Sequence, residues 1–499
     1  MDSVTAAGTT EIITSAKLVL ALLTPLLGAC LVSFSGRKPN VREMWSVLAA
    51  VITFLLVASM IPQVWDGKTL FYEIFQILPG VTVSLRADAL SMVFALIASV
   101  LWIGAAFYSM GYMRAHKAHS QTRFNTCFAI AIFGAVGVAF SDNLFTLYLF
   151  YEVVSISTYP LVAHDQDKKA YVGGKKYMVY LTTMAKGLIL PAMAIIYVMT
   201  GSLDFPHDIY SGIIPDDANS AIVVMLFIFC LFGFAKNGVM PFHHWLPGAM
   251  VAPTPVSALL HAVAVVKAGV FSTIRVMLYV FGVNLMDLLN LGITTAYFVG
   301  FTIIMASVIA ITKDNLKARL AYSTVSQLSY IILGVCLLTP HGIQGGIVHI
   351  ANHAFSKITL FFCAGAIIVA HHKKDISEMD GLGRAMPFTY AAFAVASLSM
   401  IGAPPVAGFV TKWQLLMGTI EAGSFGIILI LLASTLLNVC YFGPVVYRGF
   451  FCKPPPGVTY DSIKEAPMSM VIPLCCTAII SVIIGIYPDF FMNFVIRVL

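Results

Sequence analysis

Long apolar stretches recur along almost the whole chain, and they restrict its fold more than any other feature. A run of about 20 apolar residues is what one helix needs to cross the hydrocarbon core of a bilayer. Such runs predict fourteen membrane-spanning helices, at 12–34, 43–62, 89–112, 124–140, 143–163, 177–200, 219–241, 252–280, 291–311, 321–338, 343–370, 387–420, 424–447 and 467–490. We therefore expect an all-α integral membrane protein with a single polytopic membrane domain over residues 1–499.

The composition supports this class of fold and excludes others. Only 10% of the 499 residues are charged, whereas soluble domains average roughly 25%. That scarcity excludes an ordinary soluble enzyme and a disordered protein, and the net charge of +6 is spread over many loops. We therefore expect the lipid bilayer, and not nucleic acid, as a partner. The nine cysteines form no CxxC pair, so the sequence predicts no metal site and no cofactor.

Basic residues alternate between the predicted loops. They occupy the loops that follow the first, third, fifth, ninth, eleventh and thirteenth spans, whereas the loop after the sixth span carries only acidic charges. Loops rich in lysine and arginine stay on the cytoplasmic side of a membrane. This pattern predicts a multi-pass protein of the cell inner (plasma) membrane with both termini outside.

Two predicted spans contain helix-breaking residues, and a polar segment separates the second span from the third. The breaks are Gly233, Asn237, Gly238 and Pro241 in the first case, and Gly402, Pro404, Pro405 and Gly408 in the second. Broken helices at membrane depth occur where the backbone is buried in protein or lines a wet cavity. They therefore indicate a transport path. The polar segment 64–88 alternates after Pro79 and Gly80, which predicts a small surface hairpin.

Once loop and terminal positions are set aside, five lysines and one glutamate lie inside predicted spans. They are Glu152, Lys186, Lys236, Lys267, Lys357 and Lys412. A charge at the centre of a bilayer costs at least about 2.5–3.5 kcal/mol, so such residues usually mark ion or proton pathways. A buried lysine can take up and release a proton, and a nearby carboxylate favours its charged form. For Lys186 we also consider a side chain that reaches back to the membrane surface.

Histidines accompany these lysines. His349, His353 and Lys357 are four residues apart, so they share one face of a helix, and His261 lies in the span of Lys267. We interpret this series as a hydrated proton relay, to which Gln327 of the preceding span adds an amide link. Zinc binding and plain helix–helix hydrogen bonding are the alternatives. The pair lacks the glutamate and the third ligand that a zinc site would need.

Several segments together resemble one known family. They are Lys236–Met250, Ala252–His261, Val266–Val270, Leu320–Ser329, His349–Lys357 and Asp380–Pro387. The chain is similar to the antiporter-like subunits shared by respiratory complex I, Mrp-type cation/proton antiporters and membrane-bound hydrogenases. The absence of a long lateral helix, together with lysine at position 412, makes it most similar to the Mrp D-type subunit.

The resemblance implies a fold and a proton path. The fold has about fourteen helices with two inverted five-helix repeats, at 124–280 and 291–447, each with a broken helix. The residues that match the family's path are Glu152, Lys236, His261, Lys267, His349, His353, Lys357 and Lys412. By resemblance, Glu152 controls Lys236 and a lysine of the neighbouring subunit, and Lys412 leads to the outside. Lys186 departs from the family pattern, and it either extends the path or marks a redox-driven complex.

These observations lead to one expected function and two alternatives. We expect a proton-translocating subunit of a multisubunit membrane complex, coupled to cation antiport, with other membrane subunits as partners. It moves protons, and sodium as a second cation stays open. The first alternative is a proton- or sodium-pumping subunit of a redox-driven complex I-like or hydrogenase complex, and the second is a stand-alone secondary transporter. The chain shows no catalytic site of its own, so an enzyme activity would belong only to such a complex.

Overall fold

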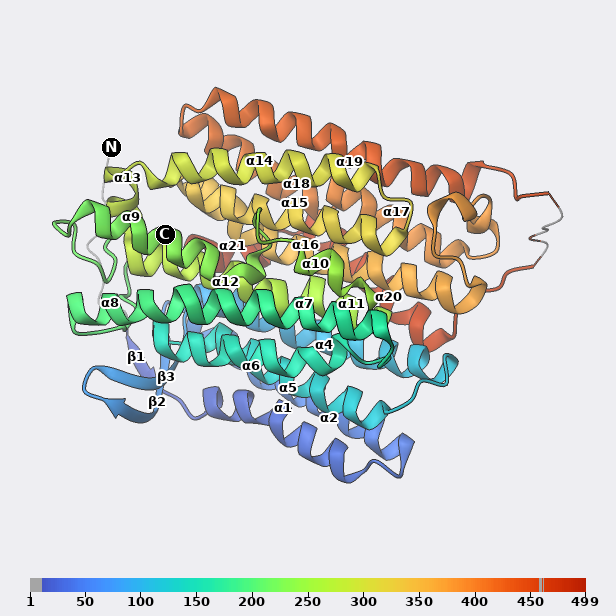
Figure 1. Ribbon diagram of the computed structural model, residues 1–499, viewed down its shortest axis with the longest axis horizontal. Helices are drawn as coiled ribbons and strands as arrows, with labels where there is room; N and C mark the ends of the chain where they lie inside the picture. The colour runs from blue at the N-terminus through green and yellow to red at the C-terminus, as the bar shows by residue number, and fades with distance from the viewer. Residues whose placement is uncertain (1–10, 457–459, 461) are drawn as a thin grey trace.

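The protein forms an elongated bundle of helices that run roughly along its long axis (Figure 1). The computed structural model describes residues 11–456, 460 and 462–499. The first helices are α1 (Lys17–Phe34), α2 (Pro39–Ala58), α3 (Ile61–Trp65), α4 (Ala89–Ala115), α5 (Gln121–Phe140), α6 (Leu144–Val162), α7 (Lys168–Met184), α8 (Leu190–Thr200), α9 (Ser220–Gly233), α10 (Trp245–Gly248), α11 (Thr254–Ala258), α12 (Val265–Val276) and α13 (Gly282–Leu288). They are followed by α14 (Leu291–Ile311), α15 (Leu316–Cys336), α16 (Pro340–His371), α17 (Pro387–Ile401), α18 (Ala407–Glu421), α19 (Phe425–Phe451), α20 (Met468–Ile486) and α21 (Asp489–Ile496).

Most of the predicted spans are present as apolar helices. Within the described residues, eleven helical segments are long and apolar enough to cross a membrane. The other three predicted spans correspond to α9, to the hydroxyl-rich helix α15, and to the pair α17 and α18. Helices α9 and α17 are short because each of them ends at one of the two breaks. The membrane fold is therefore confirmed, whereas the total of fourteen spans stays a prediction.

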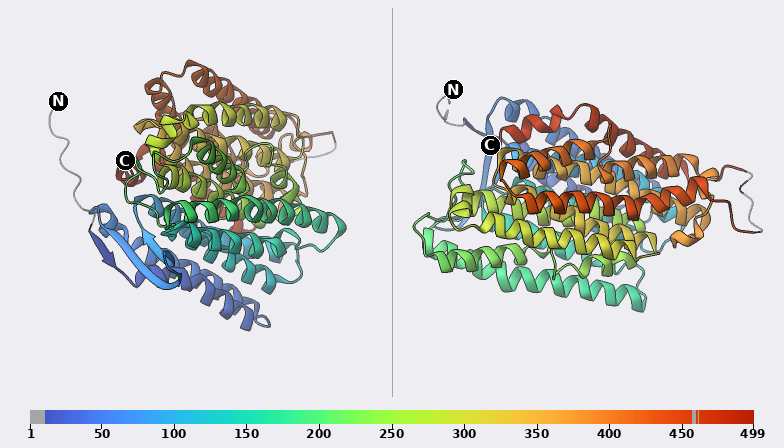
Figure 2. Two further views of the ribbon diagram at one scale, coloured as in Figure 1. Left: turned by 60° about the vertical axis from the view of Figure 1, so that its left-hand side comes forward. Right: turned by 90° about the horizontal axis from the view of Figure 1, so that it is seen from above.

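Two long helical segments form the centre of the bundle. The most apolar stretch of Thr254–Leu288 is buried throughout, and Pro340–His371 is nearly so. Helices α1 and α2 lie at one edge and turn large apolar side chains outward, among them Leu27 and Leu55 (Figure 2). Since a helix that is apolar all round belongs in the interior, the two central segments are where polar side chains must find partners within the protein.

The predicted hairpin is present and extends into a small sheet. Strand β2 (Thr69–Leu78) pairs antiparallel with β3 (Val81–Ala87), and β1 (Ile12–Thr14) pairs parallel with β2. The first predicted span is therefore wrong at its start. Residues 12–14 pair with β2, and helix α1 begins only at Lys17. Three residues are too few for the sequence to distinguish a strand from the start of a helix. Residues 12–14 form a strand because they pair with β2, which is distant in the sequence.

The connections between helices segregate to the two ends of the bundle. His116, Asp165, Asn315 and His372 belong to four predicted basic loops or their borders, and they line one cavity. Residues of the hairpin, of the segment after α8 and of the chain after α21 line a second cavity at the opposite end (Figure 1). This separation agrees with the alternation of charge along the sequence.

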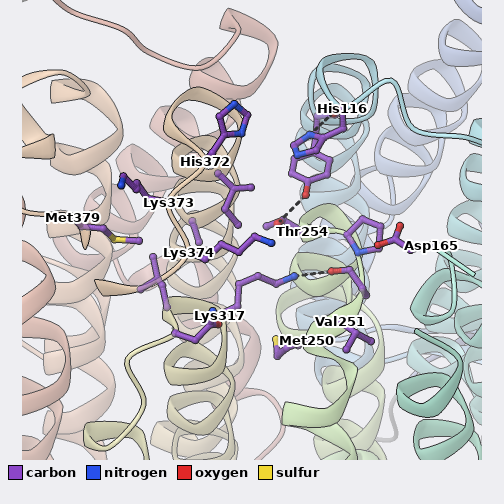
Figure 3. A pocket seen from close by; sticks show the side chains of 17 residues that line it. His116, Asp165, Met250, Val251, Thr254, Lys317, His372, Lys373, Lys374 and Met379 are labelled. Atoms are coloured by element: carbon purple, nitrogen blue, oxygen red, sulfur yellow. Dashed lines mark hydrogen bonds between the residues drawn. The ribbon is translucent and has the colours of Figure 1, made fainter. Parts of the chain in front are cut away.

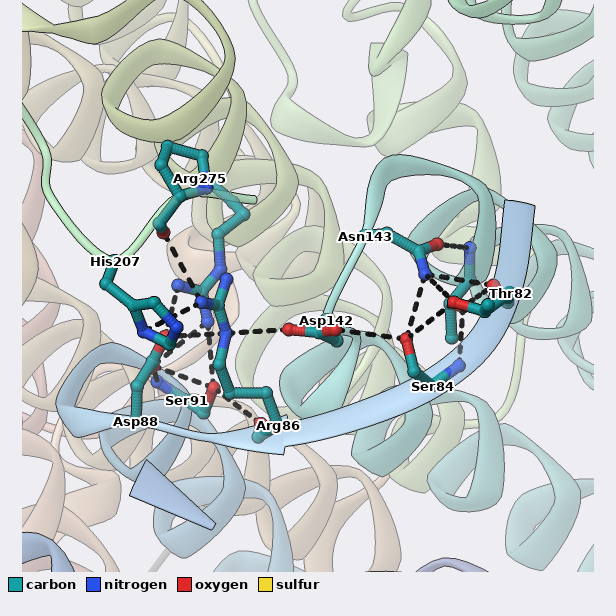
Figure 4. Close-up of polar contacts among 11 residues, drawn as sticks. Thr82, Ser84, Arg86, Asp88, Ser91, Asp142, Asn143, His207 and Arg275 are labelled. Carbon is teal, nitrogen blue, oxygen red and sulfur yellow. Dashed lines mark hydrogen bonds and ion pairs between the residues drawn. The ribbon is translucent and has the colours of Figure 1, made fainter. Parts of the chain in front are cut away.

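A network of buried ions holds the hairpin against the bundle (Figure 4). Asp88 accepts two hydrogen bonds from Arg275 of α12, at 2.6 and 3.0 Å, and its carboxylate also caps α4 through the Ser91 N–H. Arg86 of β3 forms an ion pair of 3.0 Å with Asp142 before α6. Burial tends to raise the pKa of Asp88, but the charges of Arg275 and Arg86 hold it well below its usual range. Asp88 therefore stays ionised at neutral pH.

We expect the Arg275→Met substitution to lower the free energy of unfolding by about 3–5 kcal/mol, because it leaves the largely buried Asp88 carboxylate without its main partner. The exposed pair of Lys68 and Glu11, with an N–O distance of 3.0 Å, provides the control. Lys68→Gln should cost only about 0–1 kcal/mol. Unfolding of the purified variants in mixed micelles measures both values, and equal effects would contradict the role of this network.

Candidate functional site

The first predicted break places a lysine inside the bundle. Helix α9 ends at Gly233, one 3₁₀ turn covers Ala235–Asn237, and Gly238 then takes a φ of +74°. The side-chain amide of Asn237 donates to the Leu231 carbonyl at 2.8 Å, which satisfies one of the acceptors that the break leaves free. Lys236 lies in this turn and is fully buried.

A hydroxyl group links Lys236 to Glu152 of α6. The Lys236 Nζ donates to the Ser155 Oγ at 2.7 Å and to the Tyr151 carbonyl at 2.8 Å, and it lies 3.0 Å from the centre of the Tyr151 ring. The Ser155 Oγ lies 3.4 Å from Glu152 Oε1, whereas Glu152 Oε2 is buried and has no partner in the described chain. The expected approach of Glu152 and Lys236 is therefore present, with Ser155 between them.

The central helix brings the two predicted repeats into contact. Gly269 of α12 packs so closely that a Cβ atom there would lie 2.3 Å from the Lys236 carbonyl carbon. Two residues earlier, the Lys267 Nζ lies 2.6 Å from His353 Nδ1 of α16. Because Lys267 and His353 come from different predicted repeats, this contact connects the two halves at the centre of the bundle.

His261 lies beside this contact on a π-helical turn, Leu259–Val263. Its ring packs against Phe361 at 4.7 Å between ring centres, and neither ring nitrogen has a hydrogen-bond partner among the described residues. Turns of π-helix occur often at functional sites, and this one holds a polar ring in an apolar interior. His261 is therefore a buried polar residue that forms no direct hydrogen bond with the other predicted path residues.

The remaining residues of α16 contact different neighbours along the helix. His349 lies 3.0 Å from the Gln327 Oε1 through Nε2 and 3.0 Å from the Thr411 Oγ1 through Nδ1. Lys357 donates to the Ser323 hydroxyl of α15. The amide link from Gln327 is thus present. Both ring nitrogens of His349 contact Gln327 and Thr411, whereas His353 contacts Lys267. The two histidines therefore contact different residues.

The second predicted break places Lys412 at the edge of this series. Helix α17 ends at Ile401, Gly402 takes a φ of +92°, and α18 begins at Ala407. The Lys412 Nζ donates to the Ile401 carbonyl at 2.7 Å and to the Thr435 Oγ1 at 3.1 Å. Thr411, the residue before Lys412, contacts His349. The region of the second break is therefore connected to the histidines of α16.

Sequence reasoning did not find the hydroxyl partners of the charged residues. The hydroxyls of Ser155, Ser323, Thr411 and Thr435 each contact the side chain of a predicted path residue, and the Tyr151 hydroxyl accepts from the Lys236 backbone N–H. Serine, threonine and tyrosine are common within membrane helices, so their presence alone carries no signal. Only the packing of one helix on another selects these hydroxyls.

Lys186 lies apart from these residues. It is exposed on the outer surface of the helical segment Lys168–Thr200, on a π-helical turn over Ala185–Ile189. Its side chain makes no hydrogen bond or ion pair within the part of the chain that the structure describes. The other eight predicted path residues are buried or half-buried inside the bundle.

A polar cavity of about 540 Å³ opens at the end of the bundle where the predicted basic loops meet (Figure 3). Its lining includes His116, His372, Lys374 and the carboxylate of Asp165. The Lys317 Nζ lies at the cavity and donates to the Ala252 carbonyl at 2.6 Å, just before α11 and the π-helical turn of His261. The cavity therefore reaches the start of the central segment Thr254–Leu288.

Together, the bundle, its two broken helices and the internal series of ionisable groups define a polytopic membrane protein of the antiporter-like class. A model of the NADH:quinone oxidoreductase/Mrp antiporter transmembrane family matches residues 141–438. The chain belongs to this family. The expected family is therefore confirmed, and with it an antiporter-like membrane subunit of the kind found in Mrp and complex I-like assemblies.

Relatives of both kinds match most of the chain. NADH-quinone oxidoreductase subunit N of Desulforudis audaxviator is 29% identical, and the match covers 96% of this chain and 97% of that protein. Na(+)/H(+) antiporter subunit A1 of Staphylococcus haemolyticus is also 29% identical, over 94% of this chain but only 61% of that protein. The more specific likeness to a D-type subunit stays a prediction.

Two solved structures share the fold. One is the Mrp complex from Dietzia sp. DQ12-45-1b, with a TM-score of 0.85, 19% identity and 96% of both chains covered. The other is the membrane-bound sulfane sulfur reductase, an archaeal respiratory membrane complex, with a TM-score of 0.86, 24% identity and 97% of both chains covered. These likenesses confirm the helical membrane fold.

We expect Gly408→Ala to disturb the second break, because a Cβ atom at this position would lie 1.6 Å from the Ser399 carbonyl oxygen. Ser399 or Gly408 must then shift, which should destabilise the protein by about 1–3 kcal/mol. Gly104→Ala is the control, since the nearest atom to its Cβ would be 4.0 Å away. Unfolding in mixed micelles compares the two, and an unchanged Gly408→Ala variant would contradict the tight packing.

Proposed function

We propose that this protein moves protons across the membrane as one subunit of a multisubunit complex, coupled to the antiport of a cation. The observation that carries the proposal is the contact between Lys267 and His353, which joins buried proton-binding groups of the two halves at 2.6 Å. Lysine and histidine side chains both bind and release protons, so a contact between them can pass a proton along.

The proposed path runs through both halves of the bundle. It begins with Glu152 and Lys236, continues to Lys267 and His353, and leads by way of His349 to Lys412. Apart from the contact of Lys267 with His353, no direct hydrogen bond joins these groups to one another within the described residues, so we propose that water molecules connect them. Unpartnered polar atoms at Glu152 Oε2, at His353 Nε2 and on the His261 ring support this, since buried polar groups usually bind water or protein.

The two ends of the path are proposed from the distribution of charge. The cavity beside Lys317 lies where the basic loops gather, so it serves as the cytoplasmic entrance in this proposal. Lys412 lies at the second break and contacts the free carbonyl of Ile401, which makes it the group that exchanges protons with the outside. The protein then resides in the cell inner (plasma) membrane with both termini outside.

Redox-driven pumping is the second candidate function. One observation favours it: the chain matches 97% of the length of an NADH-quinone oxidoreductase subunit N, but only 61% of an antiporter subunit A1. In that case the same path serves a complex that contains electron carriers. Purification of the intact complex in a mild detergent separates the two candidates, because electron-carrying subunits copurify only in the second.

We expect Glu152→Gln to abolish proton translocation without loss of assembly, because an amide cannot change its charge to control Lys236. Ser155→Ala should reduce the rate by roughly tenfold or more, since one linking hydrogen bond is lost. Ser157→Ala is the matched control, because the Ser157 hydroxyl donates only to the Val153 and Val154 carbonyls of its own helix. Proton uptake by vesicles with the reconstituted complex measures each rate. Wild-type uptake in assembled Glu152→Gln complexes would exclude the proposed role.

We expect Lys412→Met to block exchange with the outside, because methionine binds no proton. Lys412→Arg should also block it, since arginine keeps the positive charge but does not release a proton in proteins. A purely structural lysine would instead be replaced well by arginine. Gln414→Leu on the same helix serves as the control, and proton uptake by vesicles is again the measurement. Full activity of Lys412→Met would move the exit to another residue, with Lys357 as the next candidate.

A further inference from the structure

Lys186 is a charged residue on the outer surface of the bundle at membrane depth. It lies ten residues after Lys176 and fourteen before Thr200, which at about 1.5 Å per residue is about 15 Å and about 21 Å along the helix. Those two ends lie near the basic loop and the acidic loop that flank this segment. Lys186 is therefore close to the middle of a hydrocarbon core about 30 Å thick.

The surroundings of Lys186 within the chain do not neutralise it. Its side chain is exposed and has no partner among the described residues. The other exposed positions on this segment, such as Val179, Leu190 and Val198, are apolar. In the described transmembrane helices no other charged side chain is exposed near mid-depth. A lone ammonium facing lipid tails is costly, and a group of opposite charge at the same depth would stabilise it.

A phospholipid headgroup lies at the wrong depth to supply that charge. Headgroups lie outside the hydrocarbon core, and Lys186 is more than two helical turns from either end of its segment. A carboxylate on another membrane-spanning helix lies at the right depth. The family assignment supports such a neighbour, because the relatives and solved structures are parts of multisubunit membrane complexes.

We propose that the surface around Lys186 docks a transmembrane helix of a partner subunit, and that this helix carries an aspartate or glutamate that pairs with Lys186. The inference depends on the proposed assembly with partner subunits and not on proton conduction. It replaces the expected place of Lys186 in the proton path with a role at a subunit interface.

The shape of the surface fits a closely packed helix. Thr183, Gly187 and Ala194 are small, exposed residues on the same side of the segment. A Cβ atom on Gly187 would meet nothing within 4 Å, so this position leaves open space beside Lys186. Small residues allow membrane helices to approach each other closely, and polar contacts then hold them together.

Charge reversal tests the proposed ion pair in the intact complex. Lys186→Glu should reduce the amount of partner subunit retained in mild detergent by about tenfold or more, since two carboxylates would then face each other. Lys175→Glu is the matched control, because it makes the same change on the exposed cytoplasmic end of the same helix. Lys186→Met, which inserts without a charge, should also lower retention. Equal retention in the Lys186 variants and the control would overturn the proposal.

Photo-crosslinking then identifies the partner helix. Benzoylphenylalanine in place of Gly187 should crosslink, in native membranes, to a transmembrane peptide with an aspartate or glutamate within one or two turns. Replacing that acid by lysine should restore retention in Lys186→Glu complexes. Crosslinks to lipid alone, or to a peptide without an acid, would overturn the inference. Glu152→Gln complexes should lose proton uptake but retain the partner subunit normally. That result would support an interface at Lys186 that does not depend on proton conduction.

Discussion

A charged or polar group inside a bilayer must find its partner within the protein, because the hydrocarbon around it offers none. The buried lysines of this bundle follow that constraint. Lys236 bonds to a hydroxyl and a carbonyl, Lys267 faces His353, and Lys412 bonds to the Ile401 carbonyl. Each lysine is therefore held by neutral acceptors and not by a full ion pair. Neutral partners stabilise an ammonium less strongly than a carboxylate does, which suits the proposed transfer of protons through these lysines.

The two broken helices have complementary effects on this interior. Each break frees backbone carbonyls, and each places a lysine within reach of polar atoms near the break. At the first break Asn237 takes the Leu231 carbonyl, which leaves Lys236 to contact α6. At the second, Lys412 takes the Ile401 carbonyl itself. The first lysine is fully buried and the second only half-buried, so the two breaks differ in how exposed they leave their lysine.

The ends of the bundle use charge differently from its centre. The network of Arg86, Asp88, Asp142 and Arg275 consists of full ion pairs, and it fastens the hairpin to α4, α6 and α12. Strong pairing suits a structural clamp, because neither partner needs to change its charge. At the opposite end, three lysines, two histidines and the single carboxylate of Asp165 are among the residues that line the polar cavity. The outer surface adds a third case at Lys186, which is exposed and whose counter-charge we propose to lie on a partner subunit.

The sequence alone determined the class of the protein and most of the charged residues of its site. Membrane helices must be apolar for some twenty residues, so spans, breaks and out-of-place charges such as Lys236 and Lys412 are visible without a structure. The order of motifs likewise indicated the family. Tertiary structure alone decided the start of α1, the hydroxyl of Ser155 between Glu152 and Lys236, and the contact of Lys267 with His353. It also turned Lys186 outward. Which face of a helix meets which neighbour depends on the packing of the whole bundle, and no periodicity within one span records it.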